Sequence, residues 1–205
     1  MKKLMFNDRY GLTQAVIEGR KTMTRRIEFD KEFQKMIDDS DSYYYDDGYL
    51  VFATQDVDIH HVKTKYKVGE IVAVAQNYAN AFSSIRGIPV YGADRSPGWG
   101  NKMFVRADLM PHQIRITGIK CERLQDISEA DCLKEGIFVN EYFGNGKKCH
   151  HYGFDGFFNG TEGWFAQEWF DTPREAFASL IDKVSGKGTW ASNPWVVAYE
   201  FELVK

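Results

Sequence analysis

The sequence predicts an α+β domain in which a small, mostly antiparallel β-barrel or curled sheet is surrounded by short helices. Segments with strand patterning outnumber those with helical patterning, and the two kinds do not alternate as they do in βαβ folds. The phosphate-binding patterns GxGxxG and GxxxxGK[ST] are absent from the sequence, which argues against the doubly wound nucleotide-binding folds. A chain of 205 residues without an obvious linker is expected to form one domain, residues 1–205.

The N-terminal part alternates between short helices and a strand. Residues 8–18 have apolar residues at helical spacing, and Gly19 stands where a left-handed C-terminal cap would lie. Residues 22–27 have the β-rich alternation of a strand. Residues 30–37 have an apolar side again and predict a second short helix.

The middle of the chain is mainly strand and loop. Residues 43–54 predict a hairpin, because the pair Asp47-Gly48 favours tight reversals. Residues 71–74 and 113–124 read as strands, the first of them apolar and the second with alternating isoleucines. Residues 79–101 contain glycines without a clear period and predict a long loop.

The C-terminal part contains the clearest helix signals. Ser128 opens a helix that Gly136 closes, and Thr172-Pro-Arg-Glu175 has the complete capping box of a second one. Residues 193–204 alternate as a strand with aromatic and aliphatic residues on one face. Residues 138–170 are expected to be an insertion without regular structure.

Composition and charge exclude several classes of protein. The formal net charge of −3 excludes a uniformly basic, histone-like binder, although residues 1–35 hold nine Lys or Arg against five acids. No apolar run approaches the ~20 residues that span a bilayer, and no signal peptide is recognised, so no membrane association is expected. Three cysteines are too few for a disulfide framework and favour a reducing cytoplasm.

The strongest local signal is the cationic segment Gly19-Arg-Lys-Thr-Met-Thr-Arg-Arg26. On a strand, Thr22, Thr24 and Arg26 would share one face. Clustered cations and hydroxyls at the start of a strand suit a phosphate or a polar base edge. The alternative is an edge strand whose charges prevent aggregation. The candidate ligand-binding residues of the segment are Arg20, Lys21, Thr22, Arg25 and Arg26.

Within this segment, Gly19, Lys21, Thr24 and Arg26 follow the spacing of the signature G-x-K-x-x-E-x-R. The chain thereby resembles the ASCH domain (activating signal cointegrator homology) of the PUA-like superfamily, and in particular ASCH-like proteins of phages and prophages. The matching stretches occur in the expected order, at residues 12–27, 66–78, 114–137, 173–185 and 193–203. The resemblance implies a PUA-like β-barrel, here with insertions at about 79–101 and 138–170.

Two positions depart from that pattern. Thr24 replaces the Glu of the broad signature, as in the small ASCH amidohydrolases that remove the acetyl group from N4-acetylcytidine. Ala75-Gln76 stands where many relatives have an Arg-Glu pair. Whatever role that pair has in the relatives is therefore not expected in this chain.

The resemblance to the amidohydrolases implies a catalytic trio of Lys21, Thr24 and Glu135, the last of which precedes Gly136. Lys21 or a water would be the nucleophile, Glu135 the general base, and Thr24 would orient or polarise the amide. The alternative for Glu135 is a surface position in the last turn of its helix, where the helix dipole disfavours a carboxylate.

A second group of candidate ligand-binding residues lies in the middle of the chain. In ASCH-like relatives a stretch similar to residues 96–102 forms one wall of the cleft. The cations of the group suit phosphate contacts, and the alternative is a tight loop with an anchoring Trp99. The candidates are Gln76, Tyr78, Trp99, Lys102, Arg106 and Arg115.

Residues 138–170 also contain eleven aromatic residues interspersed with glycines. Aromatic rings beside cations can stack on unpaired bases. The alternative, which we favour, is that the insertion builds its own small core, with Trp164 or Tyr152 at a cleft. The run Cys149-His150-His151 lacks the ligand spacing of a zinc site, so no metal or other cofactor is expected.

Together these features favour recognition of nucleic acid, RNA or a modified nucleotide, through a basic cleft. One alternative is an amidohydrolase that acts on N4-acetylcytidine or a related acylated nucleoside. Another is a phage-encoded interaction module whose insertion binds a host or phage protein. All three assume a cytoplasmic protein whose oligomeric state the sequence does not determine.

Overall fold

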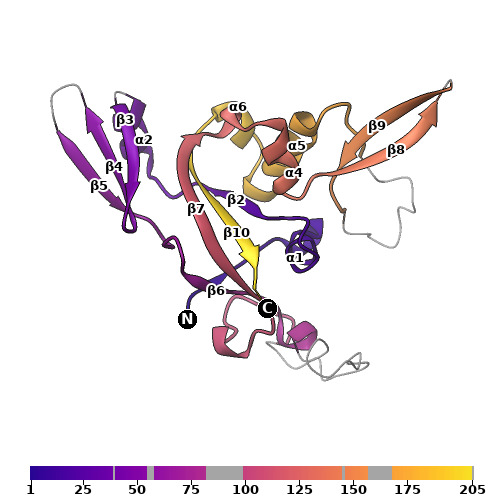
Figure 1. The fold of residues 1–205 in the computed structure, drawn as a ribbon, viewed down its shortest axis with the longest axis horizontal. Helices are drawn as coiled ribbons and strands as arrows, with labels where there is room; N and C mark the ends of the chain where they lie inside the picture. The colour runs from indigo at the N-terminus through magenta and orange to yellow at the C-terminus, as the bar shows by residue number, and fades with distance from the viewer. Residues whose placement is uncertain (39, 55–57, 82–98, 145, 157–167, 205) are drawn as a thin grey trace.

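The fold is mixed α+β in the computed structural model, which describes residues 1–38, 40–54, 58–81, 99–144, 146–156 and 168–204 (Figure 1). Its centre is a five-stranded sheet in which β1 runs parallel to β6 and the other neighbours pair antiparallel. Across the sheet the strands are β1 (Lys3–Leu4), β6 (Ile71–Val74), β7 (Gln113–Arg123), β10 (Trp195–Leu203) and β2 (Met23–Arg26). A mostly antiparallel sheet with short helices is thereby confirmed.

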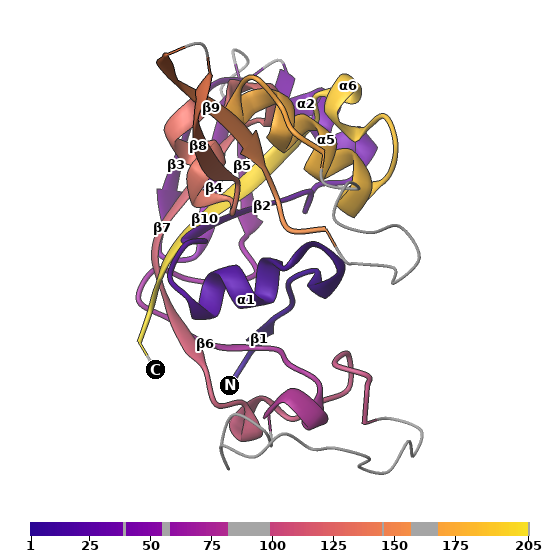
Figure 2. The ribbon, with the colours of Figure 1, turned by 90° about the vertical axis from the view of Figure 1, so that its right-hand side faces the viewer.

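The helices lie close to the positions that the sequence predicts. They are α1 (Leu12–Ile17), α2 (Lys31–Asp38), α4 (Glu129–Lys134), α5 (Pro173–Ser185) and α6 (Thr189–Ser192), with 3-10 turns at Asp8–Tyr10, Ala107–Leu109 and Leu124–Asp126. The single helix expected over residues 8–18 is interrupted, because Gly11 adopts a left-handed φ of 62° between a 3-10 turn and α1. In Figure 2, α1 lies between β6 and β2. Within the described residues, no helix has both the length and the apolar character needed to cross a membrane.

The central strand β10 is buried on both faces over part of its length. The alternation expected for residues 193–204 is therefore only partly correct: Val196 to Tyr199 are all buried. On one face, Tyr199 packs against Tyr66 with ring centroids 5.2 Å apart. On the other, Val196 shares a cleft wall with Leu180 of α5. Because both faces of β10 are packed against other residues over this part, its polar residues, Glu200 and Glu202, lie near its C-terminal end.

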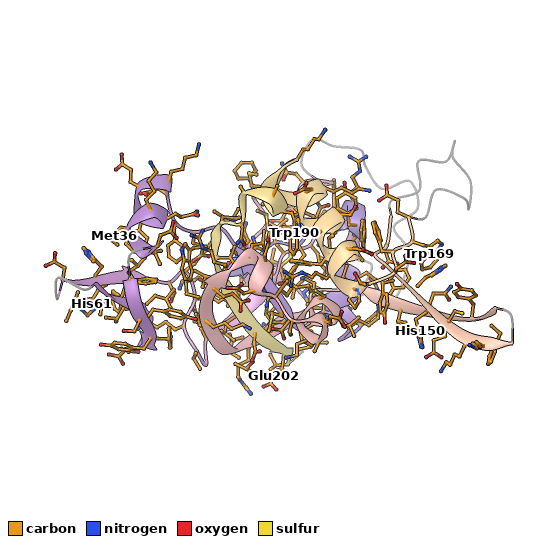
Figure 3. The ribbon with its side chains drawn as sticks, turned by 90° about the horizontal axis from the view of Figure 1, so that it is seen from above. Met36, His61, His150, Trp169, Trp190 and Glu202 are labelled. Carbon is orange, nitrogen blue, oxygen red and sulfur yellow. The ribbon has the colours of Figure 1, made fainter. Side chains whose placement is uncertain are left out.

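Two smaller sheets extend from opposite sides of this centre (Figures 1 and 3). One contains β3 (Ser40–Asp46), β4 (Tyr49–Thr54) and β5 (Ile59–Lys63), and the expected turn Asp47-Gly48 joins its first two strands. The other is the hairpin of β8 (Phe138–Gly144) and β9 (Lys147–Gly153).

The β8–β9 hairpin corrects the expectation that residues 138–170 lack regular structure. Gly146, with a φ of 74°, belongs to the connection of a regular hairpin, so a glycine-rich pattern that suggested a loop instead marks a reversal. Tyr152 forms a bridge to Phe170 and packs against the main core. Residues 82–98, in the predicted loop, and Trp164 lie outside the described residues.

The capping box of α5 provides a test of how local sequence stabilises this fold. The Thr172 side chain accepts a hydrogen bond from the Glu175 backbone N–H, and the Glu175 carboxylate accepts one from the Thr172 N–H. We expect Thr172→Ala to lower the free energy of unfolding by about 1 kcal/mol, measured by urea denaturation. Thr172→Ser keeps the acceptor and should cost much less; equal losses for the two variants would contradict a capping role.

Candidate functional site

A cleft of about 940 Å³ opens beside β2, within the size range of small-molecule sites. Much of its lining comes from the segment before α1, strand β2, the end of α4 and the C-terminal half of α5, and other segments add Lys63, Lys65 and Lys102. The lining includes Phe6, Asp8, Lys21, Thr24, Arg25, Arg26, Glu28, Lys63, Lys65, Lys102, Glu135, Leu180 and Val184. Polar and charged groups therefore gather on the side of β2, and α5 supplies the apolar wall.

Lys21 and Glu135 meet in this cleft. The Lys21 Nζ donates to Glu135 Oε2 at 2.6 Å and to the Glu135 carbonyl oxygen at 2.7 Å. Both side chains are buried, with 2 % and 5 % of their surfaces exposed. Residues that are 114 positions apart in the sequence thus form one buried ion pair at the wall of the cleft.

The turns on either side explain how this pair forms. After α1 the chain reverses at Gly19, with a φ of 72°, and the backbone N–H of Lys21 donates to the Ala15 carbonyl at 2.9 Å. The Thr22 N–H donates to the Lys134 carbonyl at 2.9 Å, which attaches the start of β2 to the end of α4. Gly136 has a φ of 101°, a backbone conformation that residues other than glycine rarely adopt, and a Cβ there would lie 3.3 Å from Leu12 Cδ2. A glycine is therefore favoured at the end of α4.

Burial lowers the pKa of the Lys21 ammonium, and the nearby Glu135 carboxylate opposes that effect only in part. Arg25 and Arg26 add to the lowering because they are like charges. A lysine with a lowered pKa in a cleft is typical of a functional site.

Arg25 holds the carboxylate side of the pair. Its buried guanidinium donates from Nη1 to Glu135 at 3.1 Å, from Nε to Glu122 at 2.7 Å and from Nη2 to Asp131 at 3.2 Å. Burial disfavours the charged guanidinium and so lowers the pKa of Arg25. The nearby carboxylates of Glu135 and Glu122 together have the larger effect, and the pKa of Arg25 is raised. The expected ligand-binding residue Arg25 lines the cleft, yet its donors are directed to carboxylates of β7 and α4. It fixes Glu135 against the sheet.

Three polar atoms of residues that line the cleft have no hydrogen-bond partner among the described residues. One is the hydroxyl of Thr24, a residue that is only 6 % exposed. The other two, Arg26 Nε and Glu28 Oε1, are buried. Polar atoms without partners at the edge of a cleft are more compatible with a polar ligand than with an apolar one.

The structure brings together some of the residues that the sequence analysis selected. Lys21, Thr24, Arg25, Arg26 and Glu135 line the cleft, and so does Lys102. Lys102 donates to Asp8 at 2.8 Å and to Thr13 Oγ1 at 3.1 Å.

The other candidates lie outside the lining of this cleft. Arg20 pairs with Glu18 and Asp155, Arg106 with Asp108, and Arg115 with Glu202, all at exposed positions. The remaining three share the region after β6: Gln76 is buried, the Tyr78 hydroxyl accepts from the Arg106 N–H, and the Tyr78 and Trp99 rings stand 6.2 Å apart. Thr22 contributes the backbone contact described above.

Sequence reasoning missed Glu28, Lys63 and Lys65 in the cleft wall. Glu28 lies two residues after the end of β2. It continues the two-residue spacing of Thr24 and Arg26, and extending that spacing would have found it. Lys63 and Lys65 come from the end of β5 and the segment after it. No local pattern connects them to β2, because tertiary folding alone brings these segments together.

Metal ligation has no support in the described residues, where no group of three or more His, Cys, Asp or Glu could hold an ion. The run Cys149-His150-His151 lies entirely on β9, where its histidines have other neighbours. His151 Nε2 lies 3.0 Å from the Tyr142 hydroxyl, and His150 lies 3.7 Å from Glu141.

Comparisons of the chain with protein-family models, with curated proteins and with solved structures found no match. The chemistry of the cleft is therefore inferred from its own residues.

Removal of the Arg25 charge should lower the stability of the protein, because Arg25 connects three carboxylates. Arg25→Met leaves the carboxylates of Glu122, Asp131 and Glu135 without their shared cation, and we expect a loss of about 3–5 kcal/mol in the free energy of unfolding by urea denaturation. Arg25→Lys should recover only part of it, because one ammonium lacks the planar fork that reaches three acids. A loss below about 1 kcal/mol for Arg25→Met would contradict a structural role of this network.

The lowered pKa of Lys21 predicts a pH dependence. Because the folded pKa lies below the unfolded value of 10.5, the unfolded chain binds more protons between those two values, and stability rises with pH in that window. We expect the stability difference between wild type and Lys21→Met to shift in favour of wild type as the pH rises toward 10.5, measured by urea denaturation at several pH values. A shift in the opposite direction would mean that Lys21 is more strongly protonated in the folded protein.

Proposed function

We propose that the protein is an ASCH-type amidohydrolase of PUA-like fold that removes the acyl group from an N-acylated pyrimidine nucleoside such as N4-acetylcytidine. The observation that carries the proposal is the buried contact of 2.6 Å between Lys21 and Glu135 at the wall of a cleft of about 940 Å³. Thr24, whose hydroxyl has no partner among the described residues, lines the same cleft. These are the three positions at which the resemblance implies catalytic residues. The mostly antiparallel central sheet supports the fold part of the proposal.

The arrangement suggests how the residues share the reaction. Because burial lowers its pKa, Lys21 has access to the neutral amine, which can accept a proton from a water that attacks the amide carbonyl carbon. Thr24 can donate its hydroxyl to the oxyanion that forms. The same proton then passes from Lys21 to the leaving nitrogen as the C–N bond breaks, which gives the free amine of the base and a carboxylic acid.

Glu135 acts through Lys21 in this scheme. Its two carboxylate oxygens accept from Lys21 and Arg25, so it has less capacity to take a proton from water directly than a carboxylate with a free oxygen. It orients the Lys21 amine and stabilises the ammonium form between the two proton transfers. Direct attack by Lys21 on the carbonyl, with hydrolysis of the resulting acyl-lysine, would use the same contacts.

A second function, binding of RNA, is favoured by the cations at the cleft. Lys63 and Lys65 have no carboxylate partner among the described residues, and Arg26 has none either. Such cations suit the phosphates of a single strand, with affinity that falls as salt is raised. In that case the cleft would hold an unpaired base without reacting with it.

Turnover of N4-acetylcytidine, followed by chromatography of released cytidine, tests the proposed chemistry. We expect Lys21→Met and Glu135→Gln each to reduce kcat by at least about 100-fold, as for loss of a proton-transfer group. Thr24→Val should reduce kcat by about 10²-fold without breaking an ion pair, as for loss of an oxyanion donor. Lys148→Ala, which removes an exposed cation paired with Glu141 on the β8–β9 hairpin, is the control that should retain wild-type turnover.

Circular dichroism establishes whether each variant is folded before its activity is compared. Absence of turnover in the wild-type protein, together with salt-dependent binding of single-stranded RNA, would overturn the enzymatic proposal and support the second function. Full activity of folded Thr24→Val and Lys21→Met would place the chemistry elsewhere.

A further inference from the structure

A second cavity of about 450 Å³ adjoins the cleft. The two share Met5, Arg26 and Lys65 as walls, so a ligand that fills the cleft is next to the second cavity. Lys2 and Lys3 of the β1 region also line the second cavity, together with the Tyr66 ring. Among the described residues, no Asp or Glu lines it. The second cavity is thus strongly cationic, whereas the cleft contains acids as well as bases.

Most of these cations have no carboxylate partner among the described residues. Within that part of the chain, Lys3 donates only to the backbone carbonyls of Met103 and Val105, at 2.5 and 2.8 Å. Lys65 has no carboxylate partner there either, and its Nζ lies 5.8 Å from the centroid of the Tyr66 ring. The exception is Lys2, which pairs with Glu70 at 3.0 Å and is half exposed. An anion in the second cavity would therefore meet Lys3 and Lys65 without a competing acid.

Hydrogen bonds and ring contacts around Tyr66 connect the segments that carry these cations. The Lys2 Nζ donates to the Lys65 carbonyl at 2.6 Å and lies 5.7 Å from the same Tyr66 ring. The Tyr66 hydroxyl in turn donates to the Lys3 carbonyl at 3.0 Å. The buried Tyr66 side chain, which is 1 % exposed, thus holds the segments of all three lysines close together.

Arg26 stands between the two cavities. Its Nη2 donates to the Met5 carbonyl at 2.5 Å, while its buried Nε has no partner in the described part of the chain. Because Arg26 has no carboxylate partner among the described residues, the charge of its guanidinium at the shared wall can attract an anion in either cavity.

We propose that the second cavity is a phosphate-binding subsite, so that the cleft acts on a nucleotide, a pyrimidine nucleoside that carries a phosphate group, in preference to a free nucleoside. This inference rests on the proposed function, since it identifies the substrate class of the same site. The base occupies the cleft beside Lys21 and Thr24, and the phosphate binds to Arg26, Lys65 and Lys3. The phosphate belongs either to a mononucleotide or to the backbone of a single strand.

Calorimetric titration with cytidine and with cytidine 5′-monophosphate tests the subsite without any need for turnover. We expect the monophosphate to bind at least about 10-fold more tightly, a typical effect of charge-assisted hydrogen bonds. Lys65→Ala should remove most of that preference, because it should weaken binding of the monophosphate more than binding of cytidine. Lys65→Gln, which keeps the length of the stem, is the second variant, and Lys148→Ala on the distant hairpin is the matched loss of one exposed cation.

A hexamer of oligocytidylate distinguishes the two sources of phosphate. A Lys65-dependent gain with the monophosphate identifies a mononucleotide, and a gain with the hexamer alone identifies a single strand; either result supports the subsite. Equal affinities for cytidine, the monophosphate and the hexamer would overturn it. So would an equal loss of affinity for all three in folded Lys65→Ala and Lys65→Gln.

The outcomes also separate this inference from the proposed function. Deacetylation of N4-acetylcytidine with no preference for the phosphorylated form would contradict the phosphate subsite and support the amidohydrolase function. A Lys65-dependent preference for the monophosphate without deacetylation of either the nucleoside or its 5′-phosphate would overturn the enzyme and support the subsite.

Discussion

The buried contact between Lys21 and Glu135 is the interaction on which the rest of the site depends. It attaches the turn after α1 to the end of α4, and the neighbouring hydrogen bond from Thr22 to Lys134 attaches the start of β2 to the same helix. A buried ion pair is costly unless its remaining hydrogen-bonding capacity is satisfied. Here Arg25 of β2 donates the second hydrogen bond to the Glu135 carboxylate.

The ionic network gives the cleft two chemically different sides. Behind β2, the donors of Arg25 are used on Glu122, Asp131 and Glu135, and this side of the network is closed. Thr24 and Arg26 also line the cleft, and in the described residues neither the Thr24 hydroxyl nor the buried Arg26 Nε has a partner. Groups that are rigidly held but unsatisfied are suited to bind a polar ligand with little reorganisation. The hydrogen bonds of Arg25 therefore hold the strand that carries Thr24 and Arg26, its neighbours on either side.

Local sequence determined much of what could be predicted. The capping residues Ser128 and Thr172 and the turn Asp47-Gly48 act over a few positions, so the helices and the hairpin that they mark follow from the sequence directly. The interruption of the first helix at Gly11 and the β8–β9 hairpin were missed. In both cases glycines are compatible with more than one backbone path, and contacts that are remote in the sequence select between them.

The sequence by itself determined that a cationic strand, β2, presents Thr24 and Arg26 at alternate positions beside Lys21. Only the tertiary structure decided what faces that strand: Glu135 from α4, Lys65 from the segment after β5, and the apolar wall of α5. The physical reason is that strand periodicity is a property of consecutive residues, whereas a cleft is formed by segments that pack together only when the whole core has assembled. The burial that lowers the pKa of Lys21 belongs to that assembly and to no stretch of sequence.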